Sequence, residues 1–238
     1  MSPALPDIKI FIDCADFASI DKTLALPWTA GYTTNPSLVS QAGVGNYTEY
    51  AAKVLKQVPT LPVSFEVLSE DMAGMEREAR IIYSWGKNVY VKIPVIDQNG
   101  NSMAELIRKL SAEGVPINVT CVFTPEQADI AAASLDAKTP AIISLFAGRL
   151  ADIGLDPLPL VAHSRKAAAA LPRAELLWAS TREVYNIWEA ARAGCKIITV
   201  PPAMAEKLKQ VGKTAHQISV EAVQAFMRDK EKAGVVFS

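Results

Sequence analysis

A single lysine stands inside an apolar segment near the middle of the chain. Lys92 lies within Val89-Tyr90-Val91-Lys92-Ile93-Pro94-Val95, where a tyrosine is the only other polar residue. An amine that is removed from water loses its proton more readily, and a neutral amine attacks a carbonyl to form a Schiff base. A lysine in such a run also occurs where its stem lies along the core and its ammonium reaches water at a strand end. The residue alone fits both interpretations equally, so its neighbours must separate them.

Other polar residues are embedded in apolar runs in the same way. They are Asp13, Thr33, Thr34, Asn35, Glu66, Asn118, Thr120, Ser144 and Ser180. Burying charged or polar groups without partners is unfavourable. We therefore expect these side chains to face one shared polar cavity and to satisfy one another there.

Such a cavity suits carbonyl chemistry through an imine. Lys92 would condense with a ketone, and the protonated imine would then act as an electron sink. Asp13 and Glu66 come from different runs, so one can serve the substrate hydroxyl while the other handles the water of imine formation. Metal ligation is the competing use of this pair, but neither His163 nor His216 lies at the end of an apolar run. We expect no metal and no cofactor.

Two arginines follow later apolar runs. Ala147-Gly148-Arg149 ends one run, and Ala179-Ser180-Thr181-Arg182 ends the next, where we expect a helix to begin. Two guanidinium groups with a helix N-terminus between them would suit a phosphate. The alternative is that both arginines form surface ion pairs with Asp152 and Glu183.

These side chains must be positioned by regular elements, and eight short apolar, β-branched runs alternate with longer amphipathic stretches. The runs cover 8–15, 30–36, 62–68, 89–95, 117–123, 141–147, 175–180 and 197–202. Each intervening stretch is long enough for a helical crossover, so the strands should be parallel. The fold class is α/β, a single (β/α)8 TIM barrel over 1–238, with its active site at the carboxyl ends of the strands. A doubly wound dinucleotide-binding sheet would need a glycine fingerprint where Cys14-Ala15-Asp16-Phe17 stands.

The helices are indicated by apolar residues three and four positions apart, as at Tyr50, Val54 and Val58. Ser102 with Glu105 predicts a capping box before Leu106, and Thr124 precedes Pro125 as an expected N-cap. An additional C-terminal helix is predicted over 218–232. It either closes the barrel or serves as a lid or a subunit contact.

Composition excludes several classes of protein. The chain has 238 residues, of which 50% are hydrophobic, and a formal net charge of −1. Such a charge produces no field that would attract nucleic acid or an anionic membrane. Three widely spaced cysteines indicate reduced core thiols. The amino-terminal residues do not follow a signal-peptide pattern, and no apolar run is long enough to span a membrane. We expect a cytoplasmic protein without nucleic-acid or membrane partners.

Several segments together resemble the transaldolases, which are Schiff-base aldolases with a (β/α)8 barrel. The resemblance rests on Ile12-Asp13, Thr33-Thr34-Asn35-Pro36-Ser37-Leu38, Val91-Lys92-Ile93-Pro94, Asn118-Val119-Thr120, Ser144-Leu145-Phe146-Ala147-Gly148-Arg149 and Ala179-Ser180-Thr181-Arg182. It implies that Lys92 forms the imine and that Asp13 deprotonates the C4 hydroxyl for carbon–carbon cleavage. Glu66 and Thr120 would hold the catalytic water. The other implied contacts are Thr33, Asn35, Asn118, Ser144 and Phe146 to the substrate, and Arg149, Ser180 and Arg182 to its phosphate.

The resemblance also bears on what happens to the captured three-carbon unit. Related fructose-6-phosphate aldolases, which release free dihydroxyacetone, carry Gln and Tyr where this chain has Glu66 and Phe146. We therefore expect transfer from fructose 6-phosphate or sedoheptulose 7-phosphate to an aldose phosphate, as in the pentose phosphate pathway. The alternatives are an aldolase of the releasing type and a non-catalytic barrel that binds sugar phosphates. Thr181 replaces a common aromatic residue, which leaves the acceptor open. Short members of the family are commonly cyclic multimers, so we expect a homo-oligomer.

Overall fold

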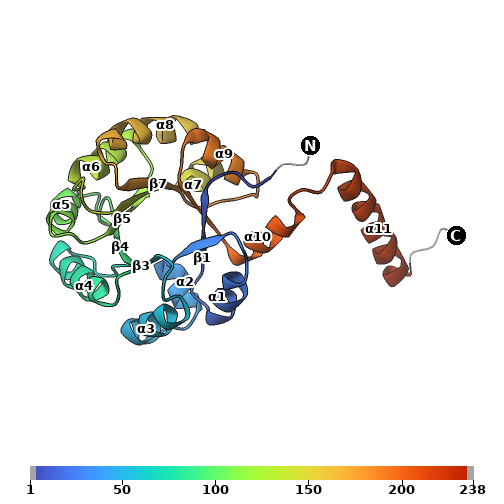
Figure 1. The fold of residues 1–238 in the computed structure, drawn as a ribbon, viewed down its shortest axis with the longest axis horizontal. Coiled ribbons are helices and arrows are strands. Elements are labelled where there is room, and N and C mark those ends of the chain that lie inside the picture. The colour runs from blue at the N-terminus through green and yellow to red at the C-terminus, as the bar shows by residue number, and fades with distance from the viewer. Residues whose placement is uncertain (1–3, 235–238) are drawn as a thin grey trace.

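Eight parallel strands close into a barrel, as the sequence predicts. The computed structural model describes residues 4–234. The strands are β1 (Lys9–Asp13), β2 (Thr29–Thr33), β3 (Val63–Glu66), β4 (Val89–Pro94), β5 (Ile117–Val122), β6 (Ala141–Leu145), β7 (Ala174–Trp178) and β8 (Ile197–Val200). Each strand pairs with the next in chain order, and β8 pairs with β1. Figure 1 shows the resulting ring of strands inside a ring of helices.

The helices follow the strands in alternation. The α-helices are α1 (Phe17–Leu24), α2 (Pro36–Gln41), α3 (Tyr47–Gln57), α4 (Met72–Ser84), α5 (Ala104–Ala112), α6 (Pro125–Ser134), α7 (Ala147–Asp152), α8 (Leu158–Ala167), α9 (Asn186–Ala193), α10 (Pro202–Lys207) and α11 (Ala215–Ala233). Two short 3₁₀ helices, η1 (Ala168–Ala170) and η2 (Leu208–Gln210), follow α8 and α10. No helix among residues 4–234 combines the length and the apolar character that crossing a membrane requires. The expected single domain over 1–238 also takes in 1–3 and 235–238, which lie outside the described residues.

The interior of the barrel is apolar at one level and polar at the next. Phe11 and Ile142 belong to a buried cluster that is separate from the core between strands and helices. Side chains two positions apart on a strand point to the same face, so Asp13 and Ser144 follow on the same inner surface. The barrel interior is thus polar at the carboxyl ends of the strands and apolar one layer below, where this cluster forms an apolar plug. Gly31 on β2 leaves room for the plug, because a Cβ there would lie 2.7 Å from the Phe11 ring.

Helix caps show where local sequence signals succeed and fail. Thr124 forms a capping box with Gln127 at the start of α6, which confirms the predicted cap. The capping box predicted at Ser102 is wrong, because α5 begins at Ala104 with Met103 as its N-cap. Ser102 instead forms an isolated bridge with Ile96, and Met103 is buried in the core. The helix thus starts one residue later than the predicted cap implies, although Oγ of Ser102 still accepts a hydrogen bond of 3.2 Å from the N–H of Ala104.

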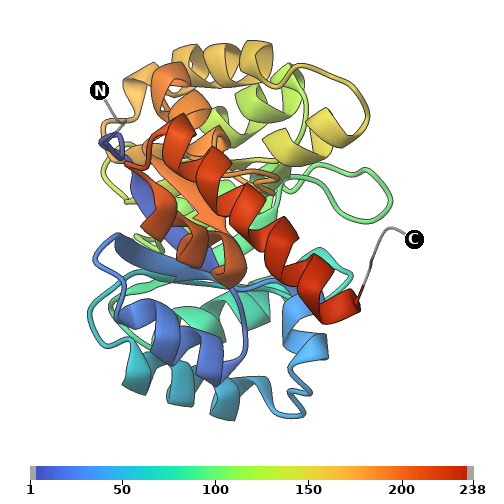
Figure 2. The same ribbon diagram turned by 90° about the vertical axis from the view of Figure 1, so that its right-hand side faces the viewer.

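Helix α11 covers the predicted 218–232 but begins at Ala215, capped by Thr214 and Gln217. The interpretation that it closes the barrel is wrong, since β8 and β1 already close it. None of its described residues is buried. Figure 1 shows the helix standing apart from the ring, and Figure 2 shows its full length from the side.

Candidate active site

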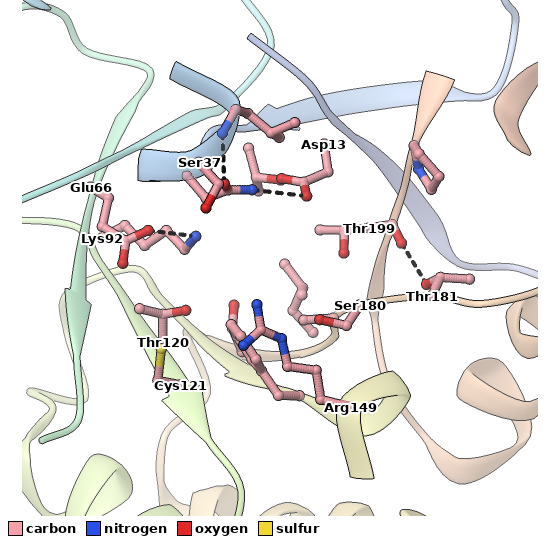
Figure 3. A pocket seen from close by; sticks show the side chains of 18 of the residues that line it. Asp13, Ser37, Glu66, Lys92, Thr120, Cys121, Arg149, Ser180, Thr181 and Thr199 are labelled. Carbon is pink, nitrogen blue, oxygen red and sulfur yellow. Dashed lines mark hydrogen bonds and ion pairs between the residues drawn. The ribbon is translucent and has the colours of Figure 1, made fainter. Parts of the chain in front are cut away.

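A cavity of about 460 Å³ opens at the carboxyl ends of the strands. It gathers side chains that are far apart in the sequence, as Figure 3 shows. The predicted site residues that line it are Asp13, Thr33, Asn35, Glu66, Lys92, Thr120, Ser144, Phe146, Arg149, Ser180 and Arg182. The expected shared polar cavity is therefore present, but two of the residues expected to face it, Thr34 and Asn118, do not line it. Oγ1 of Thr34 donates instead to the carbonyl oxygen of Ser64 at 3.1 Å.

Lys92 and Glu66 form an ion pair inside this cavity. The Lys92 Nζ lies 2.9 Å from Oε2 of Glu66 and donates a hydrogen bond of 3.1 Å to the carbonyl oxygen of Thr34. Both residues of the pair are buried, with Lys92 only 7% exposed. This geometry does not fit the alternative interpretation, in which the ammonium reaches bulk water at a strand end. The amine is held where a bound molecule would meet it.

Asp13 also lines the cavity and is held there by two donors. Oγ1 of Thr33 donates to Oδ1 at 2.7 Å, and Nδ2 of Asn35 donates to Oδ2 at 3.3 Å. Burial raises the pKa of the Asp13 carboxyl, while the charge of Lys92 and the two hydrogen bonds oppose that rise. A carboxyl with a raised pKa exchanges protons with a hydroxyl more easily than an ordinary aspartate does.

Asn35 has two roles at this edge. Its Oδ1 accepts a hydrogen bond of 3.0 Å from the backbone N–H of Leu38, which caps α2. Capping uses the oxygen and leaves the Nδ2 group to face Asp13. Strand β2 ends at Thr33 and α2 begins at Pro36, so the predicted run to residue 36 is too long.

Asn118 lies beneath the cavity floor. Its Nδ2 donates to Oγ of Ser64 at 3.0 Å, and its Oδ1 accepts from Oγ of Ser144 at 2.6 Å. The residue is fully buried. Asn118 thus orients Ser144, which does line the cavity, and its predicted contact with a substrate stays a prediction.

Thr120 stands at an irregularity in β5. The pairing of β5 with β6 shifts between Val119 and Val122, and Cys121 has a φ of 60°. A left-handed backbone at a bulge re-aims the side chains beside it. The Thr120 Oγ1 is buried and has no hydrogen-bond partner among the described residues. A buried hydroxyl of this kind is available to a water molecule or a ligand.

Arg149 and Phe146 line the end of the cavity that the sequence assigns to phosphate. The Arg149 guanidinium carbon lies 5.4 Å from the centroid of the Phe146 ring, and that ring packs against Phe123 at 5.1 Å. Arg149 forms no ion pair among residues 4–234. Its charge is therefore free to meet an anion.

Arg182 also lines the cavity but is paired with Asp152. Its Nε lies 2.8 and 3.0 Å from the two Asp152 oxygens, and Nη2 also donates to Oδ2. The predicted alternative of a surface pair is thus confirmed for Arg182, whereas Glu183 forms no ion pair within the described part of the chain. The expectation that a helix begins at Ser180 is wrong. Ser180 has a φ of 63°, and α9 begins only at Asn186.

Several cavity residues were not predicted from the sequence. They are Pro36, Ser37, Leu38, Cys121, Leu177, Ala179, Thr181, Thr199 and Pro201. Thr199 interrupts an apolar strand just as Ser144 does, so the same signal could have identified it. Cys121 carries no such signal because only the bulge turns it toward the cavity. Within residues 4–234, no group of three or more His, Cys, Asp or Glu residues could hold a metal ion.

Comparison with known proteins adds a family match over nearly the whole chain. The model of the family described as Transaldolase/Fructose-6-phosphate aldolase matches residues 10–237. A protein named "Probable transaldolase" from Nitrosopumilus maritimus is 36% identical over 94% of this chain and 96% of its own. Another "Probable transaldolase", from Thermoplasma volcanium, is 35% identical over the same shares. A "Probable transaldolase 2" from Listeria monocytogenes is 33% identical, again over 94% and 96%.

Solved structures with low sequence identity share the barrel. A 3-hexulose-6-phosphate synthase superposes with a TM-score of 0.60 at 17% identity, covering 87% of this chain and all 100% of that one. A dihydrodipicolinate synthase from Rhodopseudomonas palustris gives 0.58 at 14% identity, over 89% and 77% of the two chains. At these identities the likeness concerns the fold alone.

Proposed function

This chain belongs to the transaldolase/fructose-6-phosphate aldolase family, and from that premise we propose that it is a transaldolase acting through a Schiff base on Lys92. It would transfer a dihydroxyacetone unit from fructose 6-phosphate or sedoheptulose 7-phosphate to an aldose phosphate. The observation that carries the proposal is the Lys92 amine, buried in the cavity 2.9 Å from Glu66. We also infer a cytoplasmic enzyme of pentose phosphate metabolism, because phosphorylated sugars are retained inside cells.

The reaction begins and ends at the lysine. The Lys92 amine adds to the C2 carbonyl of the donor and loses water, which forms an iminium ion. Asp13 takes the proton of the C4 hydroxyl, the C3–C4 bond breaks, and its electron pair moves into the iminium to form an enamine. The aldose phosphate leaves. The enamine then attacks the acceptor aldehyde, Asp13 returns the proton to the new hydroxyl, and water hydrolyses the iminium.

The positions of the proposed proton carriers support these steps. Asp13 has a raised pKa and is fixed by Thr33 and Asn35. Glu66 and the unpartnered hydroxyl of Thr120 line the same cavity as Lys92, so a water for imine formation could be held between them. Arg149, Ser180 and Arg182 would receive the phosphate at the other end.

Transfer requires that the enamine waits for an aldehyde. Release would instead require protonation of the enamine carbon, followed by hydrolysis. Phe146 presents a ring without a hydroxyl to the cavity. This residue adds no proton donor there, which supports transfer over release.

Borohydride trapping tests the proposal. Incubation with fructose 6-phosphate and sodium borohydride should add a reduced three-carbon or hexose phosphate adduct at Lys92, detected by mass spectrometry of the peptides. Lys92→Ala is the matched control and should carry none. Absence of an adduct in the parent protein, or an adduct on another lysine, would contradict the mechanism. Continuous formation of glyceraldehyde 3-phosphate without an acceptor would indicate the releasing aldolase.

We further propose that the enzyme is a homo-oligomer. Helix α11 exposes apolar side chains, among them Val223 at 57% and Phe226 at 72%. Such residues favour a protein–protein contact when they share one helix. Light scattering after size exclusion should give a multiple of the 25.6 kDa chain mass, and Phe226→Asp should lower it. A monomeric parent protein at micromolar concentration would contradict this proposal.

A further inference from the structure

We propose that Asp152 is a positioning residue that directs Arg182 toward the phosphate of the substrate and so determines selectivity for phosphorylated sugars. The inference rests on the proposed function, because it takes this end of the cavity as the phosphate site. Asp152 itself does not line the cavity. It would act only through the arginine.

The geometry of the pair leaves part of the guanidinium free. Asp152 occupies the Nε–H and one Nη2–H of Arg182. A guanidinium has five N–H donors in a fixed plane. Three donors therefore remain, two on Nη1 and one on Nη2, and the carboxylate fixes the plane in which they lie. An exposed arginine without such a partner would have to lose the freedom of its long side chain on binding.

The backbones that carry the two residues are also fixed relative to each other. The N–H of Gly148 in α7 donates to the carbonyl oxygen of Ala179 at 3.2 Å. A Cβ at Gly148 would lie only 1.6 Å from the carbonyl oxygen of Ser180, so only glycine permits this approach. Helix α7 carries Arg149 at its centre and Asp152 at its end. It therefore supplies one arginine directly and holds the other through a carboxylate.

The charges of Asp152 and the two arginines also support a positioning role for Asp152. The Arg182 guanidinium holds the pKa of Asp152 below its usual value, so the carboxylate stays ionised at neutral pH. Arg149, without an ion-pair partner among the described residues, supplies the net positive charge that an anion needs. Asp152 then orients the guanidinium of Arg182, although it also neutralises part of the positive charge of that group. A carboxylate that merely competed with phosphate for Arg182 would have the opposite effect on affinity.

The experiment compares Asp152→Asn with Glu183→Gln. Both changes remove a carboxylate close to Arg182 in the structure or the sequence, but Glu183 forms no ion pair with Arg182 in the described residues. Kinetics are measured with fructose 6-phosphate and with fructose as donors, and with unphosphorylated erythrose as acceptor, so that only the donor carries phosphate and the heptulose product differs from both donors. The dissociation constant of inorganic phosphate is measured by calorimetry. Melting temperatures check that each variant is folded.

We expect Asp152→Asn to raise KM for fructose 6-phosphate and the phosphate dissociation constant by about tenfold, within the range that a misplaced binding group costs. The value of kcat and the kinetics with fructose should change little, and Glu183→Gln should match the parent. Asp152→Glu should recover part of the loss. Unchanged or tighter phosphate binding in Asp152→Asn would overturn the inference. A parent protein that fails to prefer fructose 6-phosphate over fructose would instead reject the proposed phosphate site.

Discussion

Glu66 and Lys92 are directly opposite each other in the ladder between β3 and β4, and their side chains form a buried ion pair of 2.9 Å. Opposite residues on adjacent parallel strands point to the same face, so register alone brings both charges into the barrel. The carbonyl oxygen of Thr34, just beyond β2, completes the contacts of the amine. The Lys92 Nζ on β4 is therefore contacted by a residue of β3 and by the residue that follows β2.

Phe146→Tyr should increase the release of free dihydroxyacetone relative to transfer. The new hydroxyl would place a proton donor at the cavity wall, and protonation of the enamine competes with attack on an aldehyde. We expect the ratio of release to transfer to rise by about tenfold or more. It is measured by quantifying dihydroxyacetone with and without an acceptor. Phe123→Tyr is the control, because Phe123 packs against Phe146 but does not line the cavity. An unchanged ratio in Phe146→Tyr would show that Phe146 does not determine whether the three-carbon unit is transferred or released.

The buried pair should show coupling in a double-mutant cycle. Lys92→Met leaves the Glu66 carboxylate without its ion-pair partner, and we expect a loss of about 1–3 kcal/mol in the free energy of unfolding. Adding Glu66→Gln should return about 1 kcal/mol of that loss. Urea denaturation measures all four proteins. Lys9→Met, which breaks the exposed pair with Glu175, should cost less than about 1 kcal/mol. Additive effects at Lys92 and Glu66 would show that the pair is not coupled.

The free energy of unfolding of the Asp13→Asn variant should increase relative to that of the parent as pH rises. The pKa of Asp13 is raised above its ordinary value of 3.8 by burial, so above pH 4 the folded protein retains a proton that the unfolded chain has lost. Stability falls with pH wherever the folded state binds more protons. The parent therefore loses free energy of unfolding as pH rises from about 4 through the raised pKa, and the asparagine variant does not. Chemical denaturation at several pH values measures the difference.

Asp16→Asn is the control, because its effect on the free energy of unfolding should change with pH in the opposite direction. The Asp16 carboxylate caps α1 through the N–H of Ser19 at 2.8 Å. Hydrogen bonding from the Ser19 side chain, together with this backbone bond, lowers the pKa of Asp16. Its contribution to stability is present above the ordinary pKa and is lost as pH falls through the lowered one. If both variants depended on pH in the same direction, the assignment of a raised pKa to Asp13 would be wrong.

Asp13→Asn should also separate imine formation from bond cleavage. Lys92 is unchanged in this variant, so borohydride should still trap an adduct with fructose 6-phosphate. Without a base for the C4 hydroxyl, turnover should fall by roughly 10²–10⁴-fold. The trapped species should then be the six-carbon adduct, which mass spectrometry distinguishes from the three-carbon one. Turnover close to that of the parent would exclude Asp13 as the proton carrier.

Gly148→Ala should destabilise the fold and the phosphate end together. The added Cβ would lie 1.6 Å from the carbonyl oxygen of Ser180, and a backbone atom cannot move aside as a flexible side chain can. We expect a loss of about 2–4 kcal/mol in the free energy of unfolding. Gly154→Ala is the control with open space around it, and its φ of 79° should cost about 1 kcal/mol. Equal losses in the two variants would contradict the role of close approach.

Periodicity and motifs predicted most of the architecture. The eight apolar runs became the eight strands, because residues buried on both faces of a parallel sheet must be continuously apolar. Most of the embedded polar residues line one cavity, whereas Thr34 and Asn118 form their hydrogen bonds within the barrel wall. Local signals failed where tertiary contacts competed with them. Buried Met103, not Ser102, is the N-cap of α5. Ser180 has a left-handed backbone, and the expected helix begins only at Asn186.

The sequence by itself determined that a lone lysine and two carboxylates sit at the ends of apolar strands, and it thereby indicated imine chemistry. Only the tertiary structure decided their partners: Glu66 for Lys92, two donors for Asp13, Asp152 for Arg182, and the buried hydrogen bonds that withdraw Asn118 from the cavity. The physical reason is that hydrogen bonds and ion pairs act over about 3 Å. Side chains far apart in the sequence come within that distance only after the barrel closes and its register is set.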